Sequence, residues 1–314
     1  MYPRHLFVAG VLVVALAGCR PPGDGAAACG SLAPRNDDEL VLCNELDQAV
    51  VASIALPPGE APTGGWPGVV MLHGSTGLFL DGDDSCSETL QDQFRIWAEL
   101  LISRGYAVIM PASFYSRGFC DWTKTLTVPR KYDDVERLVT RTFDTAAAAE
   151  WMCEDERVDC SRLAVFGFSN GASTAMLSMQ HDLSVSDDPR LRELDGAMSF
   201  AGGVAYYPGC GLQSQLANRL DAAEVDTYFY PHAPLWVPHA ENDKLLERCE
   251  SLRDPQVDVV AEQLGVTQDM FELEVYPDAD HGFDVWFTGD PESDLAARMA
   301  AQDETLSRLD AWLQ

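Results

Sequence analysis

The chain has 314 residues, of which 46% are hydrophobic, so it is long enough for one large or two modest domains with a sizeable buried core. It carries 50 acidic and 21 basic residues, which gives a formal net charge of -29. A surface of this sign repels phosphate backbones and so excludes nucleic acid as an expected partner, and it disfavours substrates with several carboxylates.

Residues 1–18 are typical of an export signal. A short segment with Arg4 precedes an apolar run over residues 6–17, which is too short to span a bilayer as a helix. The run ends in Leu16-Ala17-Gly18-Cys19, which resembles the lipobox of bacterial lipoproteins, where the chain is cut before a cysteine that is then lipidated. The following stretch begins rich in Pro, Gly and Ala, and we expect a flexible tether over residues 19–45.

The lipobox resemblance implies an exported protein anchored to a bacterial membrane through lipidated Cys19, facing the periplasm or the cell surface. Arg20, at the next position, favours the outer membrane by the Gram-negative sorting rule. The alternative is an ordinary secretory signal with an incidental cysteine at this position.

The chain has nine cysteines, an odd number that suits an exported protein poorly. Assigning Cys19 to the lipid leaves an even set, which predicts disulfides. The sequence alone leaves many pairings of these cysteines open. Among them, the pairs we expect are Cys29–Cys43, Cys86–Cys120, Cys153–Cys160 and Cys210–Cys249. No cysteine or histidine spacing is typical of a structural zinc site, and no metal or organic cofactor is expected.

Short apolar runs alternate with longer amphipathic stretches after residue 45, which predicts one α/β domain over residues 46–314. Such alternation builds right-handed βαβ units, and hence a mostly parallel central sheet with helices on both faces. The predicted helices are 88–105, 132–153, 172–180 and 292–314. The predicted strands are 49–56, which alternates as a half-exposed strand does, and 68–74, 106–114, 162–168, 196–202, 234–240 and 271–277.

Ligands of such a sheet bind beyond the carboxyl ends of its strands, so the residues that follow each strand matter most. Gly167-Phe168-Ser169-Asn170-Gly171 is a G-x-S-x-G pentapeptide between the strand "LAVF" and a helix-like segment. This is the strand–turn–helix context of a nucleophile elbow, in which the positions two before and two after the serine must be nearly free of side chains. An inert glycine-rich turn would have the same local pattern.

A serine hydroxyl is a poor nucleophile at neutral pH without a base. His281 lies in "YPDADHGFD", directly after the predicted strand 271–277 and before the last helix. This is where the last member falls in the chain order Ser…Asp…His, so we predict that His281 is the base of Ser169.

The acid that orients this histidine is expected after an intervening strand. Asp243 lies just beyond the predicted strand 234–240 and is our choice. Glu241 is the alternative, whereas Asp280 and Asp284 lie too close to His281 along the chain to reach across its ring.

An oxyanion site needs two backbone N–H groups aimed at the developing negative charge. One is predicted from Asn170, the residue after the nucleophile. The other is predicted from the loop "HGSTGL" after an earlier strand, where Ser75 is our choice and Thr76 the next. His73 is expected to brace that loop through hydrogen bonds.

With these residues in place, the chain from about residue 48 to residue 314 resembles the dienelactone hydrolase branch of the α/β-hydrolase superfamily. The resemblance rests on "VVMLHGSTGL", "FRIWAELLISRGYAVIMPASFYSRGFC", "LAVFGFSNGAS", "HAENDKL" and "VYPDADHGFD". It implies an α/β-hydrolase fold and an esterase-type acyl transfer, with Ser169, Asp243 and His281 as the triad, in agreement with the residues themselves.

Two positions depart from the pattern of the founding dienelactone hydrolases. Those enzymes have a cysteine where this chain has Ser169, and an arginine shortly after the histidine, where this chain has Asp284 and Val285. Arg117 in "FYSRGFC" either lines the pocket or forms an ion pair.

We therefore predict a serine hydrolase that cleaves carboxylic esters or lactones, with a small-molecule substrate; the oligomeric state is left open. One alternative is a serine peptidase of the prolyl-oligopeptidase-like type, which shares this core. The other is a non-catalytic surface binding protein with a vestigial pocket.

Overall fold

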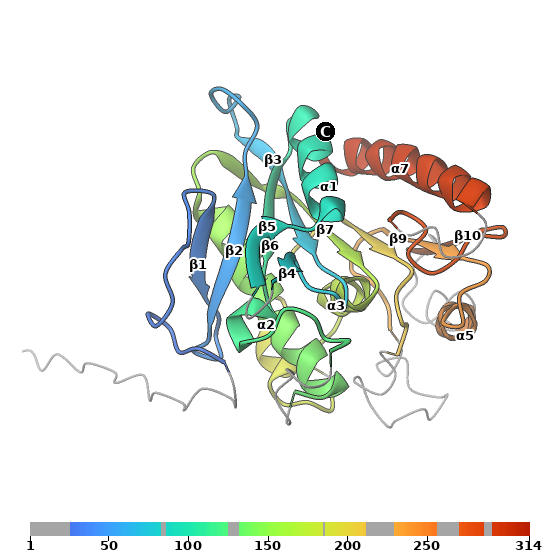
Figure 1. Ribbon diagram of the computed structural model, residues 1–314, viewed down its shortest axis with the longest axis horizontal. Helices are drawn as coiled ribbons and strands as arrows, with labels where there is room; N and C mark the ends of the chain where they lie inside the picture. The colour runs from blue at the N-terminus through green and yellow to red at the C-terminus, as the bar shows by residue number, and fades with distance from the viewer. Residues whose placement is uncertain are drawn as a thin grey trace, which may run out of the picture.

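An eight-stranded sheet forms the centre of the computed structural model (Figure 1). The first two neighbour pairs, β1·β2 and β2·β6, are antiparallel and all the others are parallel. The strands lie side by side in the order β1 (Glu39–Cys43), β2 (Ala49–Ala55), β6 (Ala107–Pro111), β3 (Trp66–Leu72), β7 (Val158–Phe168), β8 (Gly202–Tyr206), β9 (Leu235–Ala240) and β10 (Phe271–Tyr276). The predicted mostly parallel sheet is confirmed.

The structure describes residues 26–82, 86–124, 132–184, 186–211, 229–255, 270–285 and 291–314. The expected signal, residues 1–18, and Cys19 lie outside these ranges. Within them, no helix has both the length and the apolar character needed to cross a membrane.

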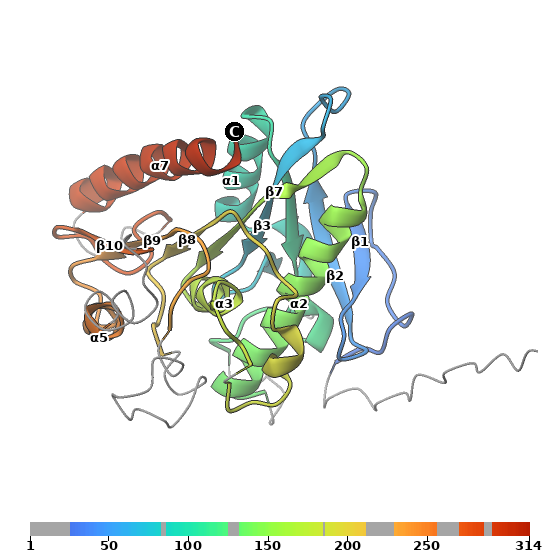
Figure 2. The same cartoon turned by 180° about the vertical axis from the view of Figure 1, so that it is seen from behind.

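Helices cover both faces of the sheet, as Figures 1 and 2 show from opposite sides. Side chains of β3 alternate between the two hydrophobic clusters: Val70 and Leu72 belong to one, and Val69 and Met71 to the other. The run "VVML" is therefore continuously apolar because both faces of the strand are buried. One cluster includes α2 (Asp134–Glu154), α3 (Asn170–Ser178) and α5 (Leu246–Pro255), and the other α1 (Asp92–Ser103) and α7 (Pro291–Leu313).

Three expectations about the elements are wrong in detail. The helix predicted from residue 88 begins at Asp92, because residues 86–90 form β5 (Cys86–Leu90), which pairs with β4 (Phe79–Asp81). The strand predicted at 196–202 is β8, Gly202–Tyr206. Its two glycines lie inside the strand because the packing leaves no room: a Cβ on Gly202 would meet the ring of Trp312. The strand predicted to be half-exposed, β2, is buried over its first five residues.

The tether expected over residues 19–45 contains a strand of the sheet, so this expectation is wrong for residues 39–43. Strand β1 pairs with β2 in continuous register from Glu39↔Ser53 to Cys43↔Ala49. The Cys29–Cys43 disulfide and a bridge between Ala28 and Gln48 hold the preceding segment to the same edge. The stretch begins rich in Pro, Gly and Ala, which predicted a tether for all of it, although the alternating residues "ELVLC" at its end are typical of a strand.

All four expected disulfides are present: Cys29–Cys43, Cys86–Cys120, Cys153–Cys160 and Cys210–Cys249. The described residues bring Cys29, Cys43 and Asp47 close enough to suggest a metal site, but the two sulfurs are bonded to each other and offer no thiolate.

Arg117 forms a buried ion pair. Its guanidinium donates to both carboxylate oxygens of Asp144, at 2.7 and 3.0 Å, and to the side chain of Gln48 at 2.7 Å. The side chains of Arg117 and Asp144 are 3% and 0% exposed. Of the two roles open for Arg117, the structure assigns the ion pair.

Candidate active site

Ser169 occupies a sharp turn between β7 and α3. Its backbone has φ 50° and ψ -112°, a left-handed conformation that non-glycine residues rarely adopt. A Cβ on Gly167 would collide with the carbonyl of Gly171, and one on Gly171 would collide with the carbonyls of Leu72 and His73. The two glycines of the pentapeptide therefore permit a turn that no larger residue at either position would allow.

The turn brings three of the predicted residues into one hydrogen-bonded chain. The Oγ atom of Ser169 donates to Nε2 of His281 at 3.0 Å, and Nδ1 of His281 donates to Oδ2 of Asp243 at 2.5 Å. The donor roles follow from chemistry, because a carboxylate only accepts and therefore fixes the proton on Nδ1. The arrangement places an imidazole against the serine hydroxyl and a carboxylate behind the imidazole.

Asp243 is held as a charged acceptor. Its Oδ1 atom accepts from the backbone N–H of Leu245 at 2.9 Å, and Nδ1 of the buried His239 lies 3.8 Å from Oδ2. Burial opposes the charge of Asp243, but the hydrogen bond and charge of His281, together with the N–H of Leu245 and the nearby His239, outweigh it and hold the carboxyl pKa below its usual value.

The competing carboxylates are engaged elsewhere. Glu241 accepts from the backbone N–H of Asp278 at 3.0 Å, and Asp284 accepts from Gln93 at 2.8 Å. The carboxylate that His281 contacts is that of Asp243. The structure therefore favours Asp243 over each of the alternatives that the chain offers.

Ser169 opens into a hollow of about 260 Å³ that Ser75 and Asn170 also line. Asn170 is the first residue of α3, so its N–H is one of the helix-terminal donors without an intrahelical acceptor. Ser75 follows the neighbouring strand β3, and its carbonyl accepts from the N–H of Trp122 at 2.7 Å. Both predicted oxyanion residues thus lie beside Ser169.

The loop that carries Ser75 is braced from both sides. His73 is fully buried, and its Nδ1 lies 2.8 Å from the carbonyl of Gly74. The Nε2 group of Gln91 donates to the carbonyl of Thr76 at 2.8 Å. Gly77 has φ 87° and packs so closely on the carbonyl of Cys120 that a side chain is excluded there. These contacts support the structural role expected for His73.

Tyr207 and Asp284 form a buried pair behind His281 that the sequence did not indicate. The ring of Tyr207 meets the His281 ring edge-on, with centroids 4.8 Å apart, and its hydroxyl donates to Asp284. Gln93 also donates to Asp284, at 2.8 Å, and burial raises the pKa of this carboxyl. Had the β8 strand been placed at Gly202–Tyr206, Tyr207 would have stood out as a residue directly after a strand.

The walls of the hollow are covalently tied. Gly209 and Gly211 line one side and Leu245 and Arg248 the other. The buried Cys210–Cys249 disulfide links the segment after β8 to α5, between these two walls. Arg137, whose guanidinium stacks on Trp122 at 4.0 Å, also lines the hollow.

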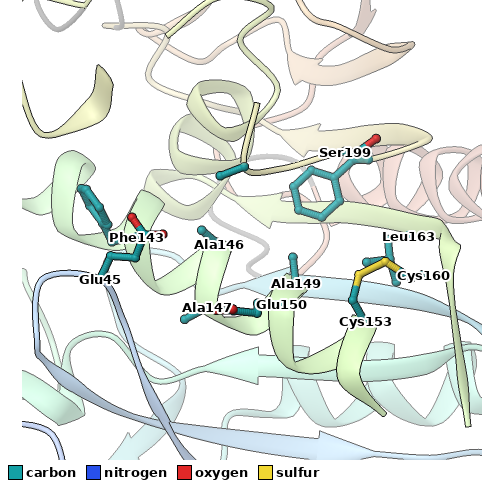
Figure 3. Close-up of a pocket in the computed structure, with 12 residues that line it drawn as sticks. Glu45, Phe143, Ala146, Ala147, Ala149, Glu150, Cys153, Cys160, Leu163 and Ser199 are labelled. Carbon is teal, nitrogen blue, oxygen red and sulfur yellow. A yellow bond between two sulfur atoms is a disulfide. The ribbon is translucent and has the colours of Figure 1, made fainter. Parts of the chain in front are cut away.

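A second hollow, of about 360 Å³, lies along α2 and has no comparable chemistry (Figure 3). Its lining includes Ala146, Ala149, the Cys153–Cys160 disulfide and the carboxylates of Glu45 and Glu150. Neither the serine–histidine pair nor any other histidine lines it. The hollow at Ser169 is therefore the candidate active site, although it is the smaller of the two.

The sheet order, the helices on both faces and the serine at the strand–helix turn together define the α/β-hydrolase fold, and solved structures share it. Esterase 2 of Thermogutta terrifontis is 18% identical with a TM-score of 0.54, over 90% of this chain and 98% of that one. A candidate dienelactone hydrolase of Klebsiella pneumoniae is 20% identical with a TM-score of 0.54, over 88% of this chain and 96% of that one.

A puromycin-hydrolyzing peptidase of Mycobacterium tuberculosis is 17% identical with a TM-score of 0.57, over 88% of this chain but only 40% of that one. A comparison with curated proteins gives no match. The Dienelactone hydrolase family model matches residues 51–314. The chain belongs to the Dienelactone hydrolase family, and this membership supports hydrolase activity.

The strained turn predicts an unusual order of stability for two substitutions. Ser169→Ala keeps a Cβ at φ 50°, whereas Ser169→Gly removes it, so the glycine variant should have a higher free energy of unfolding, by about 1 kcal/mol. Urea denaturation with the disulfides intact measures the difference. The same two substitutions at the exposed Ser251, inside α5, should give the opposite order. An alanine variant at Ser169 as stable as the glycine variant would contradict a strained turn.

Proposed function

We propose that the protein is a serine hydrolase that cleaves carboxylic esters or lactones, with Ser169 as its nucleophile. The observation that carries the proposal is the hydrogen-bonded chain from Ser169 through His281 to Asp243 at the carboxyl edge of the sheet. The family membership supports hydrolysis, and the G-x-S-x-G turn supports a serine as the attacking group.

The reaction follows from this geometry. His281 takes the proton of Ser169 as Oγ attacks the substrate carbonyl, and Asp243 stabilises the imidazolium that forms. The N–H groups of Asn170 and Ser75 stabilise the oxyanion of the tetrahedral intermediate. When the tetrahedral intermediate collapses, the bond between its carbon and the alcohol oxygen breaks. The alcohol leaves with the proton from His281, and the acyl group remains on Ser169. Water activated by the same histidine then releases the acid and restores the serine.

The founding dienelactone hydrolases bind the carboxylate of their substrate through an arginine that this chain lacks at the corresponding position. Asp284 follows the histidine where those enzymes carry an arginine, and it is buried against Tyr207 and Gln93. Arg117, the other candidate cation, is held by Asp144. These two positions therefore offer no cation to a substrate carboxylate, and the cations that line the hollow with Ser169 are instead Arg137 and Arg248.

Kinetics of p-nitrophenyl acetate hydrolysis test the proposed triad. Asp243→Asn should lower kcat by about 10⁴-fold, because the amide no longer fixes the His281 proton on Nδ1 or stabilises the imidazolium. Glu241→Gln is the matched control, because its carboxylate bonds a backbone N–H outside the chain of three residues, and it should retain the wild-type kcat. Equal losses in the two variants would refute the role of Asp243.

Peptide hydrolysis is the competing activity, since the peptidase neighbour shares the fold. Aminoacyl-naphthylamides assayed beside short acyl esters separate the two classes: we expect turnover of the esters only. Absence of any turnover, together with no reaction of Ser169 with an organophosphorus probe, would favour a non-catalytic binding protein.

We also propose that the protein is exported and anchored to a bacterial membrane by a lipid on Cys19, and that this membrane is the outer membrane. The lipobox-like Leu16-Ala17-Gly18-Cys19 supports the anchor, and the four disulfides support an oxidising compartment. Expressed in a Gram-negative host fed radioactive palmitate, the wild-type chain should carry label and sediment with membranes. Cys19→Ser should carry none, and a labelled serine variant would exclude Cys19 as the attachment point.

A further inference from the structure

Arg141 is a buried arginine behind the proposed active site. Arg141 lies within α2 and is 1% exposed. One terminal nitrogen of the guanidinium, Nη1, donates to the side-chain oxygen of Asn170, and the other, Nη2, donates to the backbone carbonyl of His73 at 2.6 Å. One rigid side chain therefore bridges two segments that are far apart in sequence.

The two acceptors belong to the two segments that supply the proposed oxyanion donors. Asn170 offers its own backbone N–H, and Ser75 follows His73 in the loop after β3. The planar guanidinium holds its two terminal nitrogens at a fixed separation, so its two hydrogen bonds set the distance between these segments. A displacement of about 1 Å in such donors is enough to cost a large part of their effect on the rate.

The charge of Arg141 has no close counter-ion among the described residues. Asp144, on the same helix, attracts this charge but pairs with Arg117 at 2.7 Å and also accepts from Asn44. The acceptors of Arg141 are both neutral, its Nε atom has no hydrogen-bond partner, and the ring of Phe114 lies 5.1 Å from the guanidinium carbon. Burial lowers the pKa of Arg141 to about 9, which leaves the group protonated at neutral pH.

Burying a cation with only neutral partners lowers the free energy of unfolding, so such an arrangement is rare. A negative charge that appears only during the reaction would interact favourably with it. The oxyanion of the tetrahedral intermediate is such a charge, and Asn170, whose side chain accepts from Arg141, is proposed to donate its backbone N–H to it.

We propose that Arg141 is the positioning residue of the oxyanion site: it holds the Asn170 and Ser75 segments at a fixed spacing and places an uncompensated positive charge behind them. It does not touch the substrate. This role rests on the proposed serine hydrolase function and adds to it a residue outside the catalytic motifs. The effect is greatest in the transition state, because the interacting charge is absent from the bound ester.

Arg162 provides a matched control. Like Arg141, it bridges distant segments, here through the backbone carbonyls of Gly65 at 2.8 Å and Leu313 at 3.2 Å, although its side chain is only partly buried. It differs in having a carboxylate partner, Asp159, and in lying toward the start of β7, away from Ser169. Arg162→Met therefore removes a comparable structural bridge without touching the oxyanion segments.

The test compares Arg141→Met, Arg141→Lys and Arg162→Met in ester hydrolysis and in inhibition by an alkyl boronic acid, which forms a tetrahedral adduct on an active-site serine. Arg141→Met should lower kcat by about 10- to 100-fold with KM within about threefold, and the Ki of the boronic acid should rise by the factor by which kcat falls. Arg141→Lys keeps the charge but not the two-pronged geometry and should fall in between. Arg162→Met should retain the wild-type kcat and Ki.

The outcomes separate the two proposals. A wild-type protein without esterase activity would overturn both the proposed function and the role of Arg141. An active wild type with folded Arg141 variants that match it in kcat and Ki, or that change KM alone, would overturn only the role of Arg141. If Arg141→Met does not fold, Asn170→Ala gives the same test, because it removes one acceptor of Arg141 and keeps the backbone N–H. Wild-type kcat in Asn170→Ala would then refute the positioning role.

Discussion

The close approach of two neighbouring strands at the Ser169 turn is the constraint on which the rest of the site depends. The turn places Gly171 against the carbonyls of Leu72 and His73, at the end of β3. The N–H of Ser169 donates to the carbonyl of Tyr206, at the end of β8, at 2.9 Å. The Ser169 turn is thus fixed against the strands on either side, and the loops that follow these strands lie next to it.

Each functional group then comes from a different strand end. Ser75 follows β3, Ser169 follows β7, Asp243 follows β9 and His281 follows β10. Parallel strands bring these ends to one edge, so residues separated by many positions meet without a dedicated local motif. The buried contacts behind them, from Arg141 to Asn170 and from Tyr207 to Asp284, hold the groups in place. In the proposed reaction, these buried contacts fix the groups around the developing oxyanion. The residues that line the outer part of the hollow would then contact the rest of the substrate.

Local patterns predicted much of this arrangement. The G-x-S-x-G spacing and the order of Ser169, Asp243 and His281 are readable because they depend on strand ends. The number of cysteines indicates that disulfides form, whereas the pairing depends on the fold. Elements that depend on long-range packing were harder to predict from the sequence. The glycines of β8 are typical of a strand end, and only the packing of Trp312 against Gly202 explains their place inside the strand. Strand β1 was missed because the residues before it have the composition of a flexible segment. For Arg141, the sequence offers only one indication of a role, which is a charged residue on the predicted buried face of a helix.

The reactivity of Ser169 is the central claim, and mass spectrometry after treatment with a fluorophosphonate tests it most directly. The wild-type chain should gain one phosphonyl group, and fragmentation of the peptide that contains "GFSNGAS" should place it on Ser169. Denaturing the protein before treatment should abolish the labelling, because the serine then lacks His281 as its base. Label on another residue, or an unlabelled native protein, would contradict the account.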